Sequence, residues 1–74
     1  MPVNIELFGQ LAPGMPRRQS LTLERPMSAR EVAVLLGLDL DEIGLIAIDN
    51  VQSEMEDTVP TNCRLCFFPP VSGG

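Results

Sequence analysis

The chemistry that this chain could carry is concentrated at its C-terminus, where the sequence reads Ser72-Gly73-Gly74. Two glycines have no Cβ atoms, so such a segment could enter a channel too narrow for side chains and approach a nucleotide closely. The reactive group would be the carboxylate of Gly74, which becomes an acylating agent once ATP has activated it as a mixed anhydride. Sulfide, an amine or a thiol could then take the acyl group. A glycine-rich end that merely frays is the alternative interpretation.

The two cysteines, Cys63 and Cys66, have the C-x-x-C spacing of redox and zinc sites. We expect them in or beside a strand, where three residues separate the Cα atoms by about 10 Å and turn the side chains to opposite faces. A disulfide needs Cα atoms within about 7 Å. Zinc would need two further ligands in a chain without histidine. We therefore expect structural cysteines and no metal site.

Acidic residues fall in two short clusters that could be catalytic carboxylates or metal ligands. Solvated loop charges are the simpler interpretation, because nothing apolar surrounds them to shift a pKa. The clusters are Asp39, Asp41 and Glu42, and then Glu54, Glu56 and Asp57.

The charge and the missing residue types exclude several functions. Ten acidic residues against five arginines give a net charge of −5, which argues against a nucleic-acid partner and favours one with a basic docking surface. The charge could also serve solubility alone. The chain has neither histidine nor lysine, so the commonest general base and Schiff-base chemistry are both absent. We expect a protein substrate or carrier, without a cofactor, that is not an enzyme by itself.

The length of 74 residues predicts one domain with a thin core, burying roughly 60% of the unfolded surface. No apolar stretch approaches the ~20 residues that span a membrane, so we expect no membrane association. The N-terminus lacks a basic region followed by an apolar run, which predicts a cytoplasmic location.

Alternating apolar and polar residues predict a strand over 3–8 and another over 20–25, joined by a loop rich in glycine and proline. Their inward residues would be Val3, Ile5, Leu7, Leu21 and Leu23. A helix of about nine residues follows, beginning at a capping box formed by Ser28 and Glu31 and ending at Gly37. It is too short to persist alone, so it must pack on the sheet. Its inward residues are predicted as Ala29, Val32, Leu35 and Leu36.

The remaining segments complete the predicted fold. A turn over 38–43 brings Leu40 and Ile43 to the core, a strand covers 45–48, and Asp49-Asn50 forms a tight turn. Residues 51–57 are expected to be irregular, and the last strand covers 63–68 before Pro69-Pro70. This order predicts an α+β fold of the β-grasp (ubiquitin-like) type, with a mixed four- to five-stranded sheet and one helix packed on one face. The domain would cover 1–70 and a flexible Gly-Gly tail 71–74.

Two phenylalanines, Phe8 and Phe68, are predicted to be exposed on the face of the sheet that the helix leaves uncovered. The first and last strands of this fold are adjacent and parallel, so both rings would lie on this face near the tail. Arg64 and Cys66 would share that face, while Leu65 and Phe67 point inward. Exposed aromatic rings predict a partner-binding surface. The alternative is that the loop over 9–18 covers them.

The run Phe67-Phe68-Pro69-Pro70-Val71-Ser72-Gly73-Gly74 resembles the end of the MoaD/ThiS family of ubiquitin-like sulfur carriers. Its proline pair is more similar to the molybdopterin-synthase small subunit than to the thiamine-pathway carrier. Phe8-Gly9 and Asp49-Asn50 fit the same template.

The resemblance implies that an E1-like enzyme of the MoeB/ThiF type adenylates Gly74 and that a sulfur donor converts it to a thiocarboxylate. A sulfur-accepting synthase, of the MoaE type or another, would take the sulfur. Gly73 would provide bare backbone at the reaction site. Partner contacts would come from Phe8, Phe68, Pro69, Pro70, Val71 and Ser72.

Two further functions remain open from the sequence. One is a ubiquitin-like modifier joined to target lysines through Gly74, and the other is a plain β-grasp interaction module. A chain without lysine cannot build side-chain-linked chains on itself, although it could still modify a target once.

Overall fold

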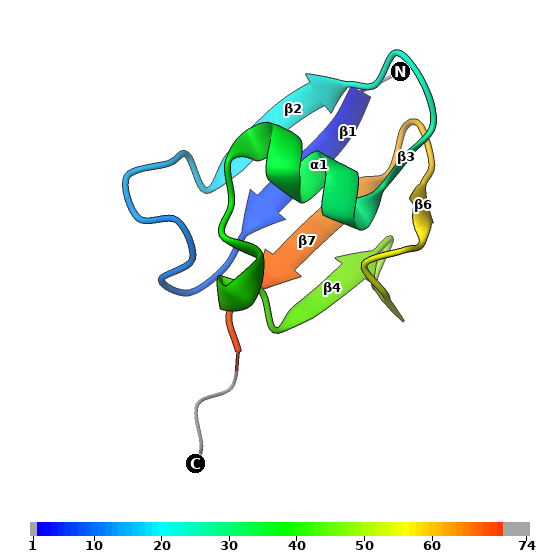
Figure 1. The fold of residues 1–74 in the computed structure, drawn as a ribbon. Coiled ribbons are helices and arrows are strands. Elements are labelled where there is room, and N and C mark those ends of the chain that lie inside the picture. The colour runs from blue at the N-terminus through cyan, green and yellow to red at the C-terminus, as the bar shows by residue number, and fades with distance from the viewer. Residues whose placement is uncertain (1, 71–74) are drawn as a thin grey trace.

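Five strands form one mixed sheet in the computed structural model, which describes residues 2–70 (Figure 1). The strands are β1 (Pro2–Leu7), β2 (Arg18–Thr22), β4 (Leu45–Ile48), β5 (Val51–Ser53) and β7 (Arg64–Phe68), and their order across the sheet is β2-β1-β7-β4-β5. β1 and β7 pair in parallel, and the other neighbours are antiparallel. The predicted adjacency of the first and last strands is confirmed, and β7 is the central strand.

The helix α1 (Ala29–Leu36) begins and ends at the predicted residues. Ser28 Oγ accepts a hydrogen bond from the Glu31 N–H at 3.1 Å, and the Glu31 carboxylate accepts one from the Ser28 N–H at 2.9 Å. Gly37 follows in the left-handed conformation with φ 82°, where its N–H closes the last turn. The capping box and the glycine stop are therefore confirmed.

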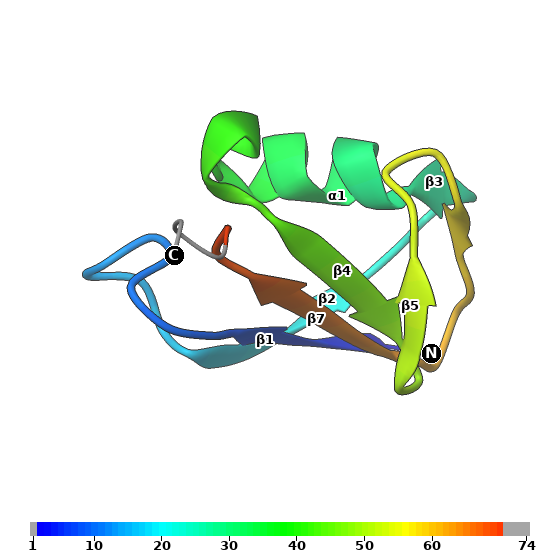
Figure 2. The same cartoon turned by 90° about the horizontal axis from the view of Figure 1, so that it is seen from below.

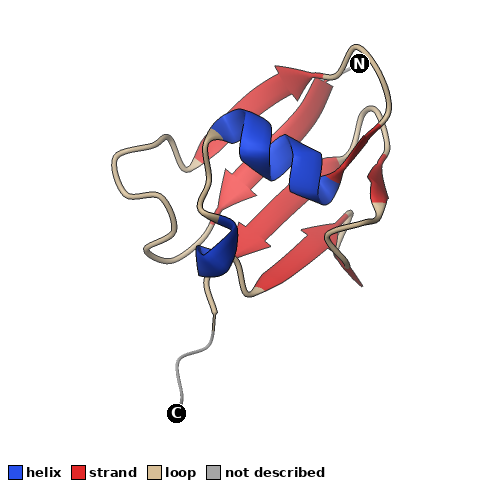
Figure 3. Ribbon diagram, viewed as in Figure 1, coloured by secondary structure: helices blue, strands red, loops and turns tan. Residues whose placement is uncertain are grey.

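The helix lies across one face of the sheet (Figures 2 and 3). Its buried residues are Ala29, Val32 and Ala33, whereas Leu35 is 58% exposed. The prediction that Leu35 points inward is wrong. At 100° per residue, Leu35 lies about 110° from the centre of the buried stripe, and Ala33 occupies the position facing the sheet. Within residues 2–70, no helix has the length and apolar character needed to cross a membrane.

The segment after β4 differs from the prediction. Asp49 and Asn50 both have positive φ, 50° and 69°, as a two-residue hairpin turn requires. The turn returns the chain antiparallel to β4, so Val51–Ser53 forms the edge strand β5 where an irregular segment was predicted. A second sheet, also not predicted, pairs the two-residue strands β3 (Met27–Ser28) and β6 (Thr58–Val59).

The core lies between α1 and the sheet. The predicted inward residues of β1 and β7 are buried, with Phe67, Ile5 and Leu65 among the largest fully buried side chains. A short 3₁₀ helix, η1 (Leu40–Glu42), follows α1. It brings Leu40 against the core, and Ile43 packs there too; both are half-buried.

Candidate partner-binding face and tail root

The face of the sheet away from α1, here called the outer face, is defined by the strand register. Cys66 on β7 lies opposite Glu6 on β1 and Ala47 on β4. Because side chains alternate along a strand, Arg64, Cys66 and Phe68 all point to this face. The predicted division of β7 between the two faces is therefore confirmed.

Phe8 and Phe68 meet at the outer face near the end of β7. Their rings are stacked, with centroids 4.4 Å apart and planes inclined by 12°. Both side chains are half-buried where exposure was predicted, and in the stack each ring covers one side of the other. Leu45 lies opposite Phe68 in the register and is 38% exposed. We call these three residues the aromatic patch.

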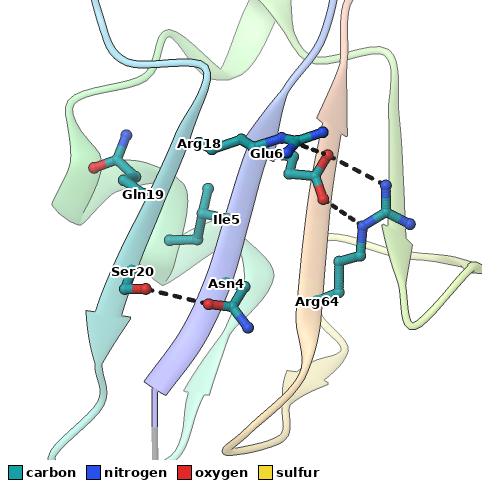
Figure 4. Close-up of a pocket in the computed structure, with 7 residues that line it drawn as sticks. All are labelled: Asn4, Ile5, Glu6, Arg18, Gln19, Ser20 and Arg64. Atoms are coloured by element: carbon teal, nitrogen blue, oxygen red, sulfur yellow. Dashed lines mark hydrogen bonds and ion pairs between the residues drawn. The ribbon is translucent and has the colours of Figure 1, made fainter.

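The opposite half of the outer face is polar (Figure 4). The Arg64 guanidinium binds both oxygens of the Glu6 carboxylate and also donates to Asn50 Oδ1 at 2.8 Å. Arg18 approaches the same carboxylate at 3.7 Å. The hydrogen bond from Arg64 holds the pKa of Glu6 below its ordinary value of 4.5, against a smaller opposing effect of desolvation. Glu6 is therefore ionised and paired near neutral pH, which does not suit a general acid.

The cysteines lie on opposite faces, as predicted. Cys63 belongs to the helix-side core and Cys66 to the outer face, and both are buried free thiols. Burial raises the pKa of each thiol, so both stay protonated near neutral pH. Among residues 2–70, no group of three or more histidine, cysteine or acidic side chains could hold a metal ion.

The acidic clusters have local structural roles. Asp39 caps η1 by accepting a hydrogen bond from the Asp41 N–H at 3.0 Å. Asp57 accepts one from the Glu54 N–H at 2.8 Å, and Glu56 pairs with an arginine of α1 at 3.1 Å. All of these acidic side chains are exposed. This arrangement is that of solvated surface charges.

The root of the tail, Pro69-Pro70, leaves the sheet beside the aromatic patch. At the end of β7, the Phe8 N–H donates to the Phe67 carbonyl at 3.0 Å, and the Gly44 N–H donates to the Phe68 carbonyl at 2.7 Å. Pro69 is half-buried and Pro70 is exposed. The predicted site residues in the described part of the chain are therefore brought together at one end of β7.

The other predicted site residues, Val71, Ser72, Gly73 and Gly74, lie outside the described residues. The sequence reasoning also missed Gly44, which contacts the tail root from the turn before β4. Its only sequence signal is a glycine directly before a strand.

No protein-family model matches the chain, and no curated protein sequence matches it either. Over residues 2–70 the structure is a small compact α+β fold with one α-helix and a mixed five-stranded sheet, an arrangement compatible with a β-grasp.

Proposed function

We propose that this protein is a β-grasp sulfur carrier whose working form ends at Gly74. An E1-like enzyme adenylates the Gly74 carboxylate, a sulfur donor converts it to a thiocarboxylate, and a biosynthetic client such as molybdopterin synthase accepts the sulfur. The observation that carries the proposal is the run from Phe67 to Gly74, which resembles the end of the MoaD/ThiS carriers and whose first two residues end the central strand β7.

Each step of this chemistry conserves atoms and charge. A carboxylate oxygen of Gly74 attacks the α-phosphorus of ATP, and pyrophosphate leaves. The sulfur of a hydrosulfide equivalent then attacks the carbonyl carbon of the acyl adenylate, and AMP leaves with the bonding pair of the broken C–O bond. The product is a thiocarboxylic acid, which loses its S–H proton to solvent and becomes the thiocarboxylate. The partner enzyme supplies the nucleotide site, so this chain needs no acid or base of its own.

The side chains of the protein suit a carrier of an activated carboxyl group. The chain has no lysine, so no side-chain amine of its own can capture the acyl adenylate. Cys63 and Cys66 are buried, and their raised pKa values keep them protonated, so they are poor nucleophiles. These features support survival of the adenylate until the sulfur donor reacts.

The outer face supports docking of the partner enzyme. The aromatic patch lies beside the tail root, so an enzyme that binds the patch would hold the adjacent tail near its nucleotide. Aromatic anchors surrounded by polar groups are typical of binding hot spots. The net charge of −5 would speed encounter with a basic partner surface.

The intact mass of the protein from its native host tests this proposal. A carrier has the mass of a chain that ends at Gly74. In a fraction of the molecules, this mass is increased by the difference between one sulfur atom and the oxygen atom of Gly74 that it replaces. Purified E1-like enzyme should also catalyse ATP–pyrophosphate exchange that depends on this chain. A mass increase that fits attachment to a lysine of another protein would indicate a modifier instead. If no activating enzyme of the host catalyses this exchange, the protein is better described as a plain interaction module.

A further inference from the structure

Two glycines border the tail root and leave no room for a side chain. Gly9 lies directly after Phe8, and Gly44 lies directly before β4. Figure 1 shows the chain leaving β7 between the loop that follows β1 and the turn that precedes β4. We propose that Gly9 and Gly44 form a seat that fixes the direction of Pro69-Pro70 and so positions Gly74 for its reaction, an inference that rests on the proposed carrier function.

The need for glycine at Gly44 is purely steric. Its φ lies outside the left-handed region, so an alanine there would meet no backbone strain. An added Cβ would instead overlap Pro70 Cα and would lie 2.6 Å from Pro70 N and 2.9 Å from Pro69 C. These are backbone atoms, which no rotamer change can move away. The tail root must therefore shift if residue 44 carries any side chain.

Gly9 restricts the other side of the tail root. An added Cβ would lie 2.7 Å from Pro69 Cγ and 3.2 Å from Pro69 Cδ, so the Pro69 ring lies directly against this glycine. Gly9 also has φ +61°, a conformation that glycine adopts without a steric cost. Its position therefore combines a required backbone conformation with a close contact to the tail root.

The loop that carries Gly9 is held by one arginine. The Arg17 guanidinium donates to the Gly9 carbonyl at 3.1 Å. It also binds three further carbonyls within the loop, those of Leu11, Ala12 and Met15, at 2.6, 2.6 and 3.3 Å. Satisfying four carbonyls from one planar group fixes the path of the loop. Gly9 therefore forms a fixed side of the seat.

The prolines make the seat effective. Each proline ring fixes φ near −65° and removes a donor, so Pro69-Pro70 cannot continue the β7 ladder. A stiff root held on both sides fixes the direction in which the chain leaves the sheet. Misplacing a reacting group by about 1 Å can cost about 100-fold in rate, so the direction of the root matters for catalysis by the partner. Gly9 and Gly44 are thus positioning residues, which act through the tail.

The experiment uses the full chain with the single change Gly44→Ala. Steady-state ATP–pyrophosphate exchange with the E1-like enzyme should show kcat reduced by about 100-fold. KM for this chain should stay within about twofold of the original, because no side chain of the aromatic patch is substituted. Nuclear Overhauser contacts between residue 44 and Pro70 should change, while amide shifts in β1 and α1 stay in place. A kcat equal to that of the unchanged chain would overturn the proposal.

Gly9→Ala provides a second variant if Gly44→Ala does not fold. Its matched control is Gly14→Ala, which has φ +91° in the same loop but no atom within 4 Å of the added Cβ. Gly9→Ala should lower kcat at unchanged KM, whereas Gly14→Ala should leave kcat unchanged. Equal kcat values for the two variants would overturn the proposal. If the unchanged chain is not adenylated at all, the carrier function fails. The seat is then judged by whether the Pro70 contacts change in Gly44→Ala, and unchanged contacts would overturn it.

Discussion

Replacing Phe8, Phe68 or both by alanine measures how far the aromatic patch stabilises the fold. Truncating a fully buried phenylalanine costs about 3–5 kcal/mol, and both rings are half-buried, so each single change should lower the free energy of unfolding by about 2 kcal/mol. The stacked geometry, with centroids 4.4 Å apart, predicts a coupling of about 1 kcal/mol between them. The double variant should therefore lose about 3 kcal/mol, less than the two single losses together.

The same values translate into melting temperatures. At about 2.1 cal/mol/K per residue, a chain of 74 residues has an unfolding entropy of about 0.16 kcal/mol/K. A loss of 2 kcal/mol then corresponds to a decrease in Tm of about 12 °C. Circular dichroism melts and urea titrations of the four chains complete the double-mutant cycle. Single losses below about 0.5 kcal/mol, or additivity within about 0.3 kcal/mol, would show that the rings do not pack on each other.

Three further predictions concern charge, thiols and the tail. The folded state lowers the pKa of Glu6, so the stabilisation from this carboxylate is complete above pH 4.5 and is lost as the pH falls through the pKa of the folded state. Glu6→Gln should therefore reduce the decrease of Tm at acid pH. An unchanged decrease of Tm at acid pH would contradict the pairing of Glu6 with Arg64. Cys63 and Cys66 should react with a thiol reagent at pH 7 only after denaturant is added, and rapid labelling of the native protein would show that they are accessible. Deleting Gly74 should abolish ATP–pyrophosphate exchange while the circular dichroism spectrum and Tm stay the same; exchange by the shortened chain would refute the carrier proposal.

Local signals in the sequence were sufficient for much of the fold. The capping box at Ser28 and Glu31, the stop at Gly37 and the turn at Asp49-Asn50 each depend on contacts within a few residues, and each was predicted correctly. Strict alternation in β1 separated the two faces of the sheet.

The errors arose where contacts distant in sequence decide the structure. β6 is a two-residue segment that forms a strand because β3, about 30 positions earlier in the chain, pairs with it. β5 differs, because it pairs with the adjacent β4 across the Asp49-Asn50 turn and its three residues are too few to show a periodicity. The direction of Leu35 depends on how α1 sits on the sheet. Half-burial of Phe8 required knowledge of its stacking on a ring 60 positions away, and the role of Gly44 depends on the path of Pro70. The spacing of apolar residues along the sequence does not report contacts between distant segments.

The central place of β7 has a mechanical consequence. A partner that grips the end of the chain while holding the outer face would pull along the axis of β7. Because β7 is bonded to β1 on one side and β4 on the other, this load shears both ladders at once, and their hydrogen bonds share the force. An edge strand that is pulled perpendicular to its axis would instead lose its hydrogen bonds to the neighbouring strand one at a time. The domain should therefore resist unfolding when β7 is pulled along its axis.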